Sequence, residues 1–237
     1  MRHLFISDLH LDSGRPHHVQ ALRDFCDNKL DSSSHLYILG DLFEAWLGDD
    51  MGLVAYADVV SLLTQLAKQG TKVFIQHGNR DFLLGKEFVA ATGAILLGEE
   101  EVIEINNRRV LLMHGDSLCT DDIDYQNFKK QVRDQQWQQD FLAMPAAQRI
   151  ELAQQYRQQS SKMTAEKDSE IMDVNSDAVL KVMAKHQVDT LIHGHTHRPM
   201  VHQNQGLTRI VLGDWQGHFD YLDWPVNDTW HFLRQPI

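Results

Sequence analysis

Near its start the chain reads Leu4-Phe5-Ile6-Ser7-Asp8-Leu9-His10. The apolar residues predict a buried β-strand, and an aspartate and a histidine follow that strand at once. Four later segments repeat the design, with an apolar strand running directly into carboxylate, amide or imidazole side chains. They are Leu39-Gly40-Asp41, His77-Gly78-Asn79-Arg80-Asp81, Met113-His114-Gly115-Asp116 and Ile192-His193-Gly194-His195-Thr196-His197. Because strand ends in open α/β sheets converge on one crevice, we expect these side chains to meet in space.

Extended and helical segments alternate through the first half of the chain. Strands are expected over residues 4–6, 36–39 and 72–76, and helices over residues 18–29, 53–68 and 82–92. This alternation predicts an α/β fold with a largely parallel or mixed sheet. Asn106-Asn107 joins two further expected strands, 102–105 and 110–113, and suits a tight hairpin turn.

Composition narrows the class of protein. The length of 237 residues suits a single domain that spans residues 1–237 and carries an insertion. A net charge of −11 argues against a general nucleic-acid binder, which needs a basic surface. No apolar run approaches the roughly 20 residues that a bilayer crossing requires, and the N-terminus does not read as a signal peptide. We expect Cys26 and Cys119 to be reduced thiols.

Residues 121–170 interrupt the alternation and are expected to form a helical insertion. They are rich in glutamine and show only helical periodicity. Ser160, Thr164 and Lys167 are spaced so that one helix face carries two hydroxyls and a cation. Such a face suits a phosphosugar, although an ordinary solvated helix face is the alternative.

The five strand-end segments together indicate a site for two metal ions. Carboxylate, imidazole and amide ligands suit manganese, iron or zinc. Two such cations polarise a phosphoryl oxygen and lower the pKa of bound water toward neutrality. A lone Asp-x-His is usually incidental, but five ligand-rich segments, each after a strand, point to one centre.

These segments resemble the calcineurin-like metallophosphoesterase superfamily, whose pattern is Asp-x-His, Gly-Asp, Gly-Asn-His-(Asp/Glu), His and Gly-His-x-His. The resemblance runs through residues 8–197 and implies a sandwich of two mixed β-sheets flanked by helices. It also implies two sets of ligands that share Asp41 as a bridge. One metal would take Asp8, His10, Asp41 and His197, and the other Asp41, Asn79, His114 and His195.

Arg80 departs from the superfamily pattern, which has histidine at this position. Arginine cannot release a proton at neutral pH, but it binds phosphate oxygens in a bidentate manner. A reaction that lacks this general acid needs a leaving group that is stable as an anion. Arg80 therefore favours hydrolysis of a pyrophosphate bond over hydrolysis of a simple monoester.

Longer motifs resemble the bacterial UDP-2,3-diacylglucosamine hydrolases of lipid A biosynthesis, over residues 37–50, 77–85, 113–122, 171–175 and 191–199. The resemblance implies hydrolysis of UDP-2,3-diacylglucosamine to UMP and 2,3-diacylglucosamine 1-phosphate. It implies two manganese ions, attack at the uridine-side phosphorus, and a peripheral position on the cytoplasmic face of the inner membrane. A metallophosphoesterase acting on a soluble nucleotide or phosphoprotein is the alternative, and a non-enzymatic scaffold is a third hypothesis. A monomer is expected.

The same resemblance assigns roles to individual residues. It implies catalytic roles for Asp41, Asn79, Arg80, His114 and His195. It implies substrate contacts for Asn79, Arg80, Asp122, Tyr125, Ser160, Thr164, Lys167 and His195. Five apolar residues are expected either to line acyl-chain channels or to belong to the core, namely Trp46, Phe82, Phe128, Phe141 and Met144.

Overall fold

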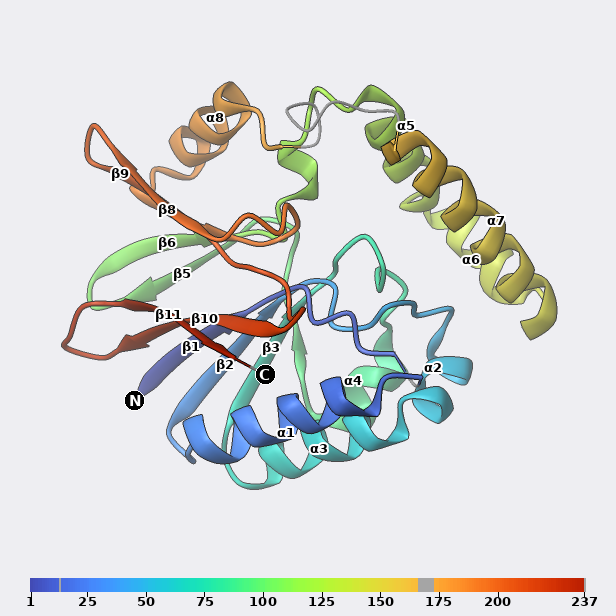
Figure 1. Cartoon of the computed structure of the whole chain (residues 1–237), viewed down its shortest axis with the longest axis horizontal. Helices are drawn as coiled ribbons and strands as arrows, with labels where there is room; N and C mark the ends of the chain where they lie inside the picture. The colour runs from blue at the N-terminus through green and yellow to red at the C-terminus, as the bar shows by residue number, and fades with distance from the viewer. Residues whose placement is uncertain (13, 166–172, 237) are drawn as a thin grey trace.

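The computed structural model describes residues 1–12, 14–165 and 173–236, which fold as two β-sheets packed face to face between helices (Figure 1). The first sheet has the strand order β11-β10-β1-β2-β3-β4 and the second β5-β6-β7-β9-β8. The first sheet comprises β1 (Arg2–Ile6), β2 (Ser34–Leu39), β3 (Lys72–Gln76), β4 (Ile95–Leu96), β10 (His218–Pro225) and β11 (His231–Pro236). The second comprises β5 (Glu101–Ile105), β6 (Arg108–Leu112), β7 (Thr190–His193), β8 (Met200–Asn204) and β9 (Leu207–Val211). The expected two-sheet α/β sandwich is confirmed.

Successive side chains of each inner strand point to opposite faces of the sheet, and both faces are packed into a hydrophobic core. Leu4 and Ile6 of β1 point to a cluster shared with the helices, whereas Phe5 between them points to the space between the two sheets. In β6, Val110 likewise faces the other sheet and Leu111 faces helix α8 (Ser176–His186). These strands are buried on both faces, which explains why they read as continuous apolar runs.

Helices α1 (Pro16–Lys29), α2 (Asp49–Ala55), α3 (Ala57–Lys68) and α4 (Lys86–Thr92) lie beside the first sheet, and α8 lies on the second (Figure 1). The single helix expected over residues 53–68 is wrong, because Tyr56 leaves helical geometry and separates α2 from α3. The helix expected from residue 82 begins only at Lys86, because Asp49 accepts hydrogen bonds from backbone N–H groups of residues 85, 87 and 88.

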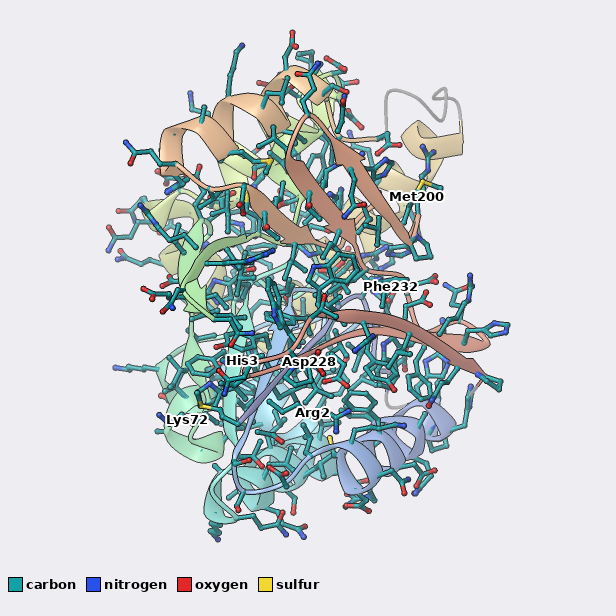
Figure 2. The ribbon with its side chains drawn as sticks, turned by 90° about the vertical axis from the view of Figure 1, so that its left-hand side faces the viewer. Arg2, His3, Lys72, Met200, Asp228 and Phe232 are labelled. Atoms are coloured by element: carbon teal, nitrogen blue, oxygen red, sulfur yellow. The ribbon has the colours of Figure 1, made fainter. Side chains whose placement is uncertain are left out.

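Parallel pairing brings the ligand-bearing segments together. Strands β1, β2 and β3 run parallel in the first sheet, and β6, β7 and β9 run parallel in the second. Figure 2, turned by 90° from Figure 1, labels Arg2, His3 and Lys72 near the other end of these strands, where β1 and β3 begin. Asn106 and Asn107 form the expected hairpin turn between β5 and β6, with φ of 52° and 61°.

Three helices occupy the region of the expected insertion. We call α5 (Ile123–Val132), α6 (Gln135–Ala143) and α7 (Ala146–Ala165) the helical arm, which extends along one side of the molecule (Figure 1). Arginines fasten it to the body. Arg149 donates to Leu47 O at 2.7 Å and pairs with Asp50, and Arg133 donates to Gly78 O at 2.9 Å. The arm is therefore docked against the loops that follow β2 and β3.

Within the described ranges, none of the helices combines the length and the apolar character that a bilayer crossing needs. Cys26 and Cys119 are both buried and are not disulfide-bonded, as expected. Burial raises the pKa of both thiols to about 12, so neither is a reactive thiolate at neutral pH.

Candidate metal centre

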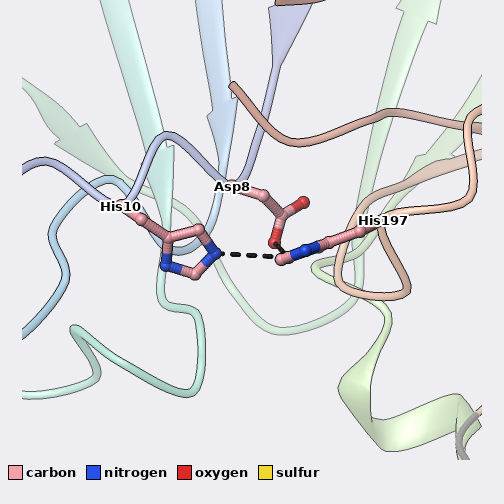
Figure 3. A group of neighbouring side chains, drawn as sticks. All are labelled: Asp8, His10 and His197. Carbon is pink, nitrogen blue, oxygen red and sulfur yellow. Dashed lines mark hydrogen bonds and ion pairs between the residues drawn. The ribbon is translucent and has the colours of Figure 1, made fainter. Parts of the chain in front are cut away.

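A first cluster of candidate ligands joins the loop after β1 to the loop after β7 (Figure 3). His10 Nε2 lies 3.2 Å from His197 Nε2, and Asp8 Oδ1 lies 3.4 Å from the same His197 nitrogen. Two imidazole nitrogens this close need a proton or a cation between them. Asp8 is fully buried, and its Oδ1 has no hydrogen-bond partner in the described structure. A buried, unsatisfied carboxylate oxygen beside two imidazoles fits a divalent metal ion.

A second cluster lies between the ends of β3, β6 and β7. His114 Nδ1 is 2.8 Å from Leu39 O, and since a carbonyl only accepts, this nitrogen carries the proton. Whenever the ring is neutral, the other ring nitrogen of His114 therefore holds a lone pair, yet it faces Asn79 Oδ1 at 3.0 Å. His195 Nδ1 lies 3.0 Å from the same amide oxygen. An acceptor facing a lone pair at this distance again fits a cation.

Asp41 stands between the two clusters. Its Oδ2 lies 3.9 Å from His10 Nε2 and 3.8 Å from His114 Nε2, and the side chain is 2% exposed. Its Oδ1 accepts a hydrogen bond from the backbone N–H of Arg80 at 2.8 Å, which fixes the carboxylate. This position suits the bridging role that the resemblance implies. The structure thus brings all seven predicted ligands into one region, in which Asp8, Asp41 and His114 are buried and His197 is exposed.

Burial and neighbouring charges shift the pKa values of these side chains. Burial opposes the charged form of His197, but the carboxylates of Asp214 and Asp8 beside the ring raise its pKa to about 10. Burial raises the pKa of Asp41 to about 6, against the opposing effect of His114. Burial lowers the pKa of His195 to about 3, and His114 acts in the same direction. A cation that binds here has to displace the proton on His197, so its affinity falls as the pH falls.

Five of the seven predicted ligands have left-handed backbone conformations, which side chains other than glycine rarely adopt. The φ values are 55° at Asp8, 48° at His10, 51° at Asp41, 68° at His195 and 54° at His197. Each such residue costs on the order of 1 kcal/mol or more. Strain concentrated on one set of side chains is typical of a functional site.

Two glycines allow the loops to approach the ligands closely. A Cβ at Gly78 would lie 2.1 Å from Asp41 Oδ1, and a Cβ at Gly194 would lie 2.3 Å from Asp8 Oδ2. Because no side chain fits in either place, the glycines of the Gly-Asn and Gly-His motifs are required by contact with the carboxylates.

Comparison with known proteins agrees with this geometry. Residues 1–199 match the family model of the calcineurin-like phosphoesterases. The chain belongs to the calcineurin-like phosphoesterase family. A protein named UDP-2,3-diacylglucosamine hydrolase from Chromohalobacter salexigens is 46% identical over 220 residues, which cover 91% of this chain and 89% of the relative. A protein of the same name from Cellvibrio japonicus is 48% identical over 219 residues, 91% of both chains. The one from Haemophilus influenzae is 42% identical over 220 residues, 92% of this chain and 93% of the relative.

Two acidic residues of this phosphoesterase contact predicted ligands but escaped the sequence reasoning. Asp214 Oδ2 lies 3.3 Å from His197 Nδ1, and Glu44 Oε2 lies 3.2 Å from His10 Nδ1. A carboxylate behind a metal-binding imidazole orients the ring and makes it a better ligand. Asp214 had a readable signal, because Leu212-Gly213-Asp214 follows strand β9 as Leu39-Gly40-Asp41 follows β2. Opposing the effect of burial, the contact with His10 and the charges of Arg80 and Arg157 lower the pKa of Glu44 to about 2.

The expected substrate contacts are placed unevenly in the phosphoesterase. Asp122 caps α5, where its Oδ1 accepts a hydrogen bond from Tyr125 N at 3.0 Å. The Tyr125 ring lies 5.9 Å from the ring of His195, beside the metal centre. Ser160 is exposed on α7. The side chain of Thr164 and the whole of Lys167 lie outside the described residues, so their expected role stays a prediction.

The expected acyl-channel residues divide into two groups. Trp46 and Phe141 are 1% and 3% exposed and belong to the hydrophobic core, so the core interpretation is correct for both. Phe82, Phe128 and Met144 are only partly buried. Phe82 lies 4.9 Å from the guanidinium carbon of the arm residue Arg133. These three remain candidates for contact with an apolar ligand.

Proposed function

We propose that this phosphoesterase hydrolyses the pyrophosphate bond of UDP-2,3-diacylglucosamine and releases UMP and 2,3-diacylglucosamine 1-phosphate, a step of lipid A biosynthesis. The observation that carries the proposal is the agreement of two independent facts. Relatives named for this hydrolysis are 42–48% identical over nine tenths of the chain, and the seven ligand residues converge in one centre. The membership in a phosphoesterase family supports the same reaction class.

The cofactor we propose is a pair of Mn²⁺ ions. Two clusters of donors, separated by Asp41, suit two ions rather than one. The donors are carboxylate oxygens, imidazole nitrogens and an amide oxygen, without thiolates, which suits manganese among the common divalent metals. When bound, two such ions polarise a phosphoryl oxygen and activate water near neutral pH.

Arg80 supplies the charge that the diphosphate needs. Its side chain is 37% exposed, so a bound phosphate can reach the guanidinium, and its backbone N–H holds Asp41 in place. It donates hydrogen bonds to phosphate oxygens and keeps its own protons. The lipid 1-phosphate departs as a stable anion without a general acid. We therefore propose attack at the uridine-side phosphorus, with the sugar phosphate as the leaving group.

The helical arm is proposed to hold the glucosamine head group and the acyl chains. Ser160, Thr164 and Lys167 would meet the polar head group from α7 and the segment after it. Partly buried apolar side chains of the arm, such as Phe128, lie on the same structure as these polar residues. A substrate with two acyl chains is a membrane lipid. We accordingly propose that the protein works as a monomer on the cytoplasmic face of the inner membrane, as a peripheral protein.

The test compares three substrates with the purified, Mn²⁺-loaded protein: UDP-2,3-diacylglucosamine, UDP-N-acetylglucosamine and a simple phosphate monoester. We expect efficient hydrolysis of the diacylated substrate alone. In ¹⁸O-labelled water, the label should enter UMP and not the lipid phosphate. Faster turnover of the soluble nucleotide or of a phosphoprotein would overturn the lipid assignment in favour of the alternative substrate class.

A further inference from the structure

One carboxylate touches three functional elements at once. Glu44 follows Asp41 by three residues, and its side chain is 17% exposed. Its Oε2 lies 3.2 Å from His10 Nδ1. Its Oε1 lies 3.4 Å from the guanidinium of Arg80 and 2.9 Å from that of Arg157 on α7. Arg157 also donates to Glu44 O at 2.7 Å, so the arm is fastened to this residue twice.

We propose that Glu44 is a positioning residue that orients His10 for metal binding and couples this ligand to the docked helical arm. The coupling part of the inference rests on the proposed function, whereas the orienting part concerns the metal centre alone. Neither role is a contact with the substrate or with the metal ions.

The orienting role follows from the two nitrogens of the His10 ring. A carboxylate beside Nδ1 favours the tautomer that carries its proton on Nδ1. Nε2 then holds the lone pair, and this is the nitrogen that faces His197 and Asp41. Without the negative charge of Glu44, the opposite tautomer becomes accessible and puts a proton where the metal ion has to bind.

The coupling role follows from the two guanidinium groups. Arg80 and Arg157 both pair with Oε1 of Glu44, although Arg80 belongs to the loop after β3 and Arg157 to the arm. The shared carboxylate separates their positive charges and fixes Arg80 from one side. Arg80 keeps further N–H groups for phosphate, because a guanidinium has five. Arm docking and the placement of the phosphate-binding arginine therefore depend on the same side chain.

The chain offers a matched control in Asp50. This carboxylate also pairs with an arginine of α7, since Arg149 Nη1 donates to Asp50 Oδ1 at 2.9 Å. It is 61% exposed and, among the described residues, pairs with Arg149 rather than with a predicted metal ligand. Asp50→Asn thus weakens one arm contact and leaves the metal centre alone, whereas Glu44→Gln affects both.

The first measurement is Mn²⁺ binding to the metal-free protein, followed by the electron paramagnetic resonance signal of free Mn²⁺. We expect Glu44→Gln to weaken Mn²⁺ binding by about 10- to 100-fold, the usual effect of removing a carboxylate behind a ligand histidine. Asp50→Asn should stay within about twofold of wild type, and Glu44→Asp should recover part of the loss. The ¹⁵N spectrum of the metal-free protein should show His10 protonated on Nδ1 in wild type only. Unchanged affinity and tautomer in folded Glu44→Gln would overturn the orienting role.

The second measurement is a double-mutant cycle on kcat/KM for the lipid substrate. When Glu44 is present, we expect Arg157→Met to lower kcat/KM about tenfold or more, as for loss of a charge-assisted hydrogen bond. When Glu44→Gln has already been introduced, the same substitution should lower kcat/KM only slightly further. Fully additive losses would overturn the coupling. A wild-type protein that binds Mn²⁺ but leaves the lipid intact would refute the proposed function instead, and the binding and tautomer results would still decide the orienting role.

Discussion

Gly78→Ala probes how tightly the catalytic loops are packed. The backbone at Gly78 has no positive φ, so alanine meets no conformational penalty there, and the effect is purely steric. The new Cβ would lie 2.1 Å from Asp41 Oδ1 and 2.3 Å from Asp41 N, where an ordinary contact begins at 3.4 Å. The loop after β3 has to retreat from Asp41 by more than 1 Å. A displacement of about 1 Å in a catalytic group typically costs roughly 100-fold in rate, and overpacking costs about 1–3 kcal/mol of stability.

The assay measures kcat/KM for UDP-2,3-diacylglucosamine with saturating Mn²⁺, together with thermal unfolding of the same preparation. We expect a folded Gly78→Ala protein with activity lowered about 100-fold. Gly98→Ala is the control, because its Cβ would meet its nearest neighbour at 3.4 Å, an ordinary contact. Wild-type activity in Gly78→Ala would refute the view that the spacing between these two loops is set by contact with Asp41.

Further variants test separate parts of the site. Asp41→Ala should lose activity by several orders of magnitude and bind both metal ions weakly, as measured by kinetics and metal content; near-normal turnover would contradict its bridging role. Arg80→His should stay impaired on the lipid substrate, and any gain should appear only on diesters with poor leaving groups. Lys167→Ala should lower kcat/KM by a factor that corresponds to about 1.5–3 kcal/mol of activation free energy, while the metal content is unchanged. Unchanged kinetics would indicate a solvated residue. Burial lowers the pKa of His3 to about 4, so His3 lowers the free energy of unfolding as the pH falls from 6.5 to 4 and leaves it unchanged above pH 6.5. His3→Phe should make the denaturant concentration at the unfolding midpoint less dependent on pH in this range. An unchanged pH dependence would exclude His3 as its cause.

The sequence was most informative where a strand meets a ligand. Asp8, Asp41 and His114 each closely follow an apolar strand. Parallel pairing of β1 with β2 places Asp8 beside Asp41, and packing of the second sheet on the first brings the end of β6, with His114, to them. The rule that parallel strand ends converge predicts the pairing of Asp8 with Asp41, whereas the approach of His114 depends on how the two sheets pack. The same reasoning missed Glu44, because a lone glutamate in a loop has no local signal that tells it from a solvated one.

Other features depend on long-range packing that no local pattern records. The break at Tyr56 between α2 and α3 depends on tertiary packing, where the Tyr56 hydroxyl donates to Ala45 O at 3.0 Å. The burial of Trp46 depends on Gly52, whose missing side chain leaves room for the indole ring. Helical periodicity predicted the arm, but its direction is set by arginines that reach carbonyl groups far along the chain, as Arg149 does at Leu47.

The pairing of β1 with β10 has a consequence for synthesis on the ribosome. Strand β1 is made first, but its antiparallel neighbour comes from residues 218–225, near the other end of the chain. Asp8 and His10 likewise wait for His195 and His197 before their cluster is complete. A nascent chain that has not yet exposed these late residues therefore has neither a closed first sheet nor a finished centre. A chain that stops before residue 195 lacks His195 and His197, so it cannot complete the metal centre.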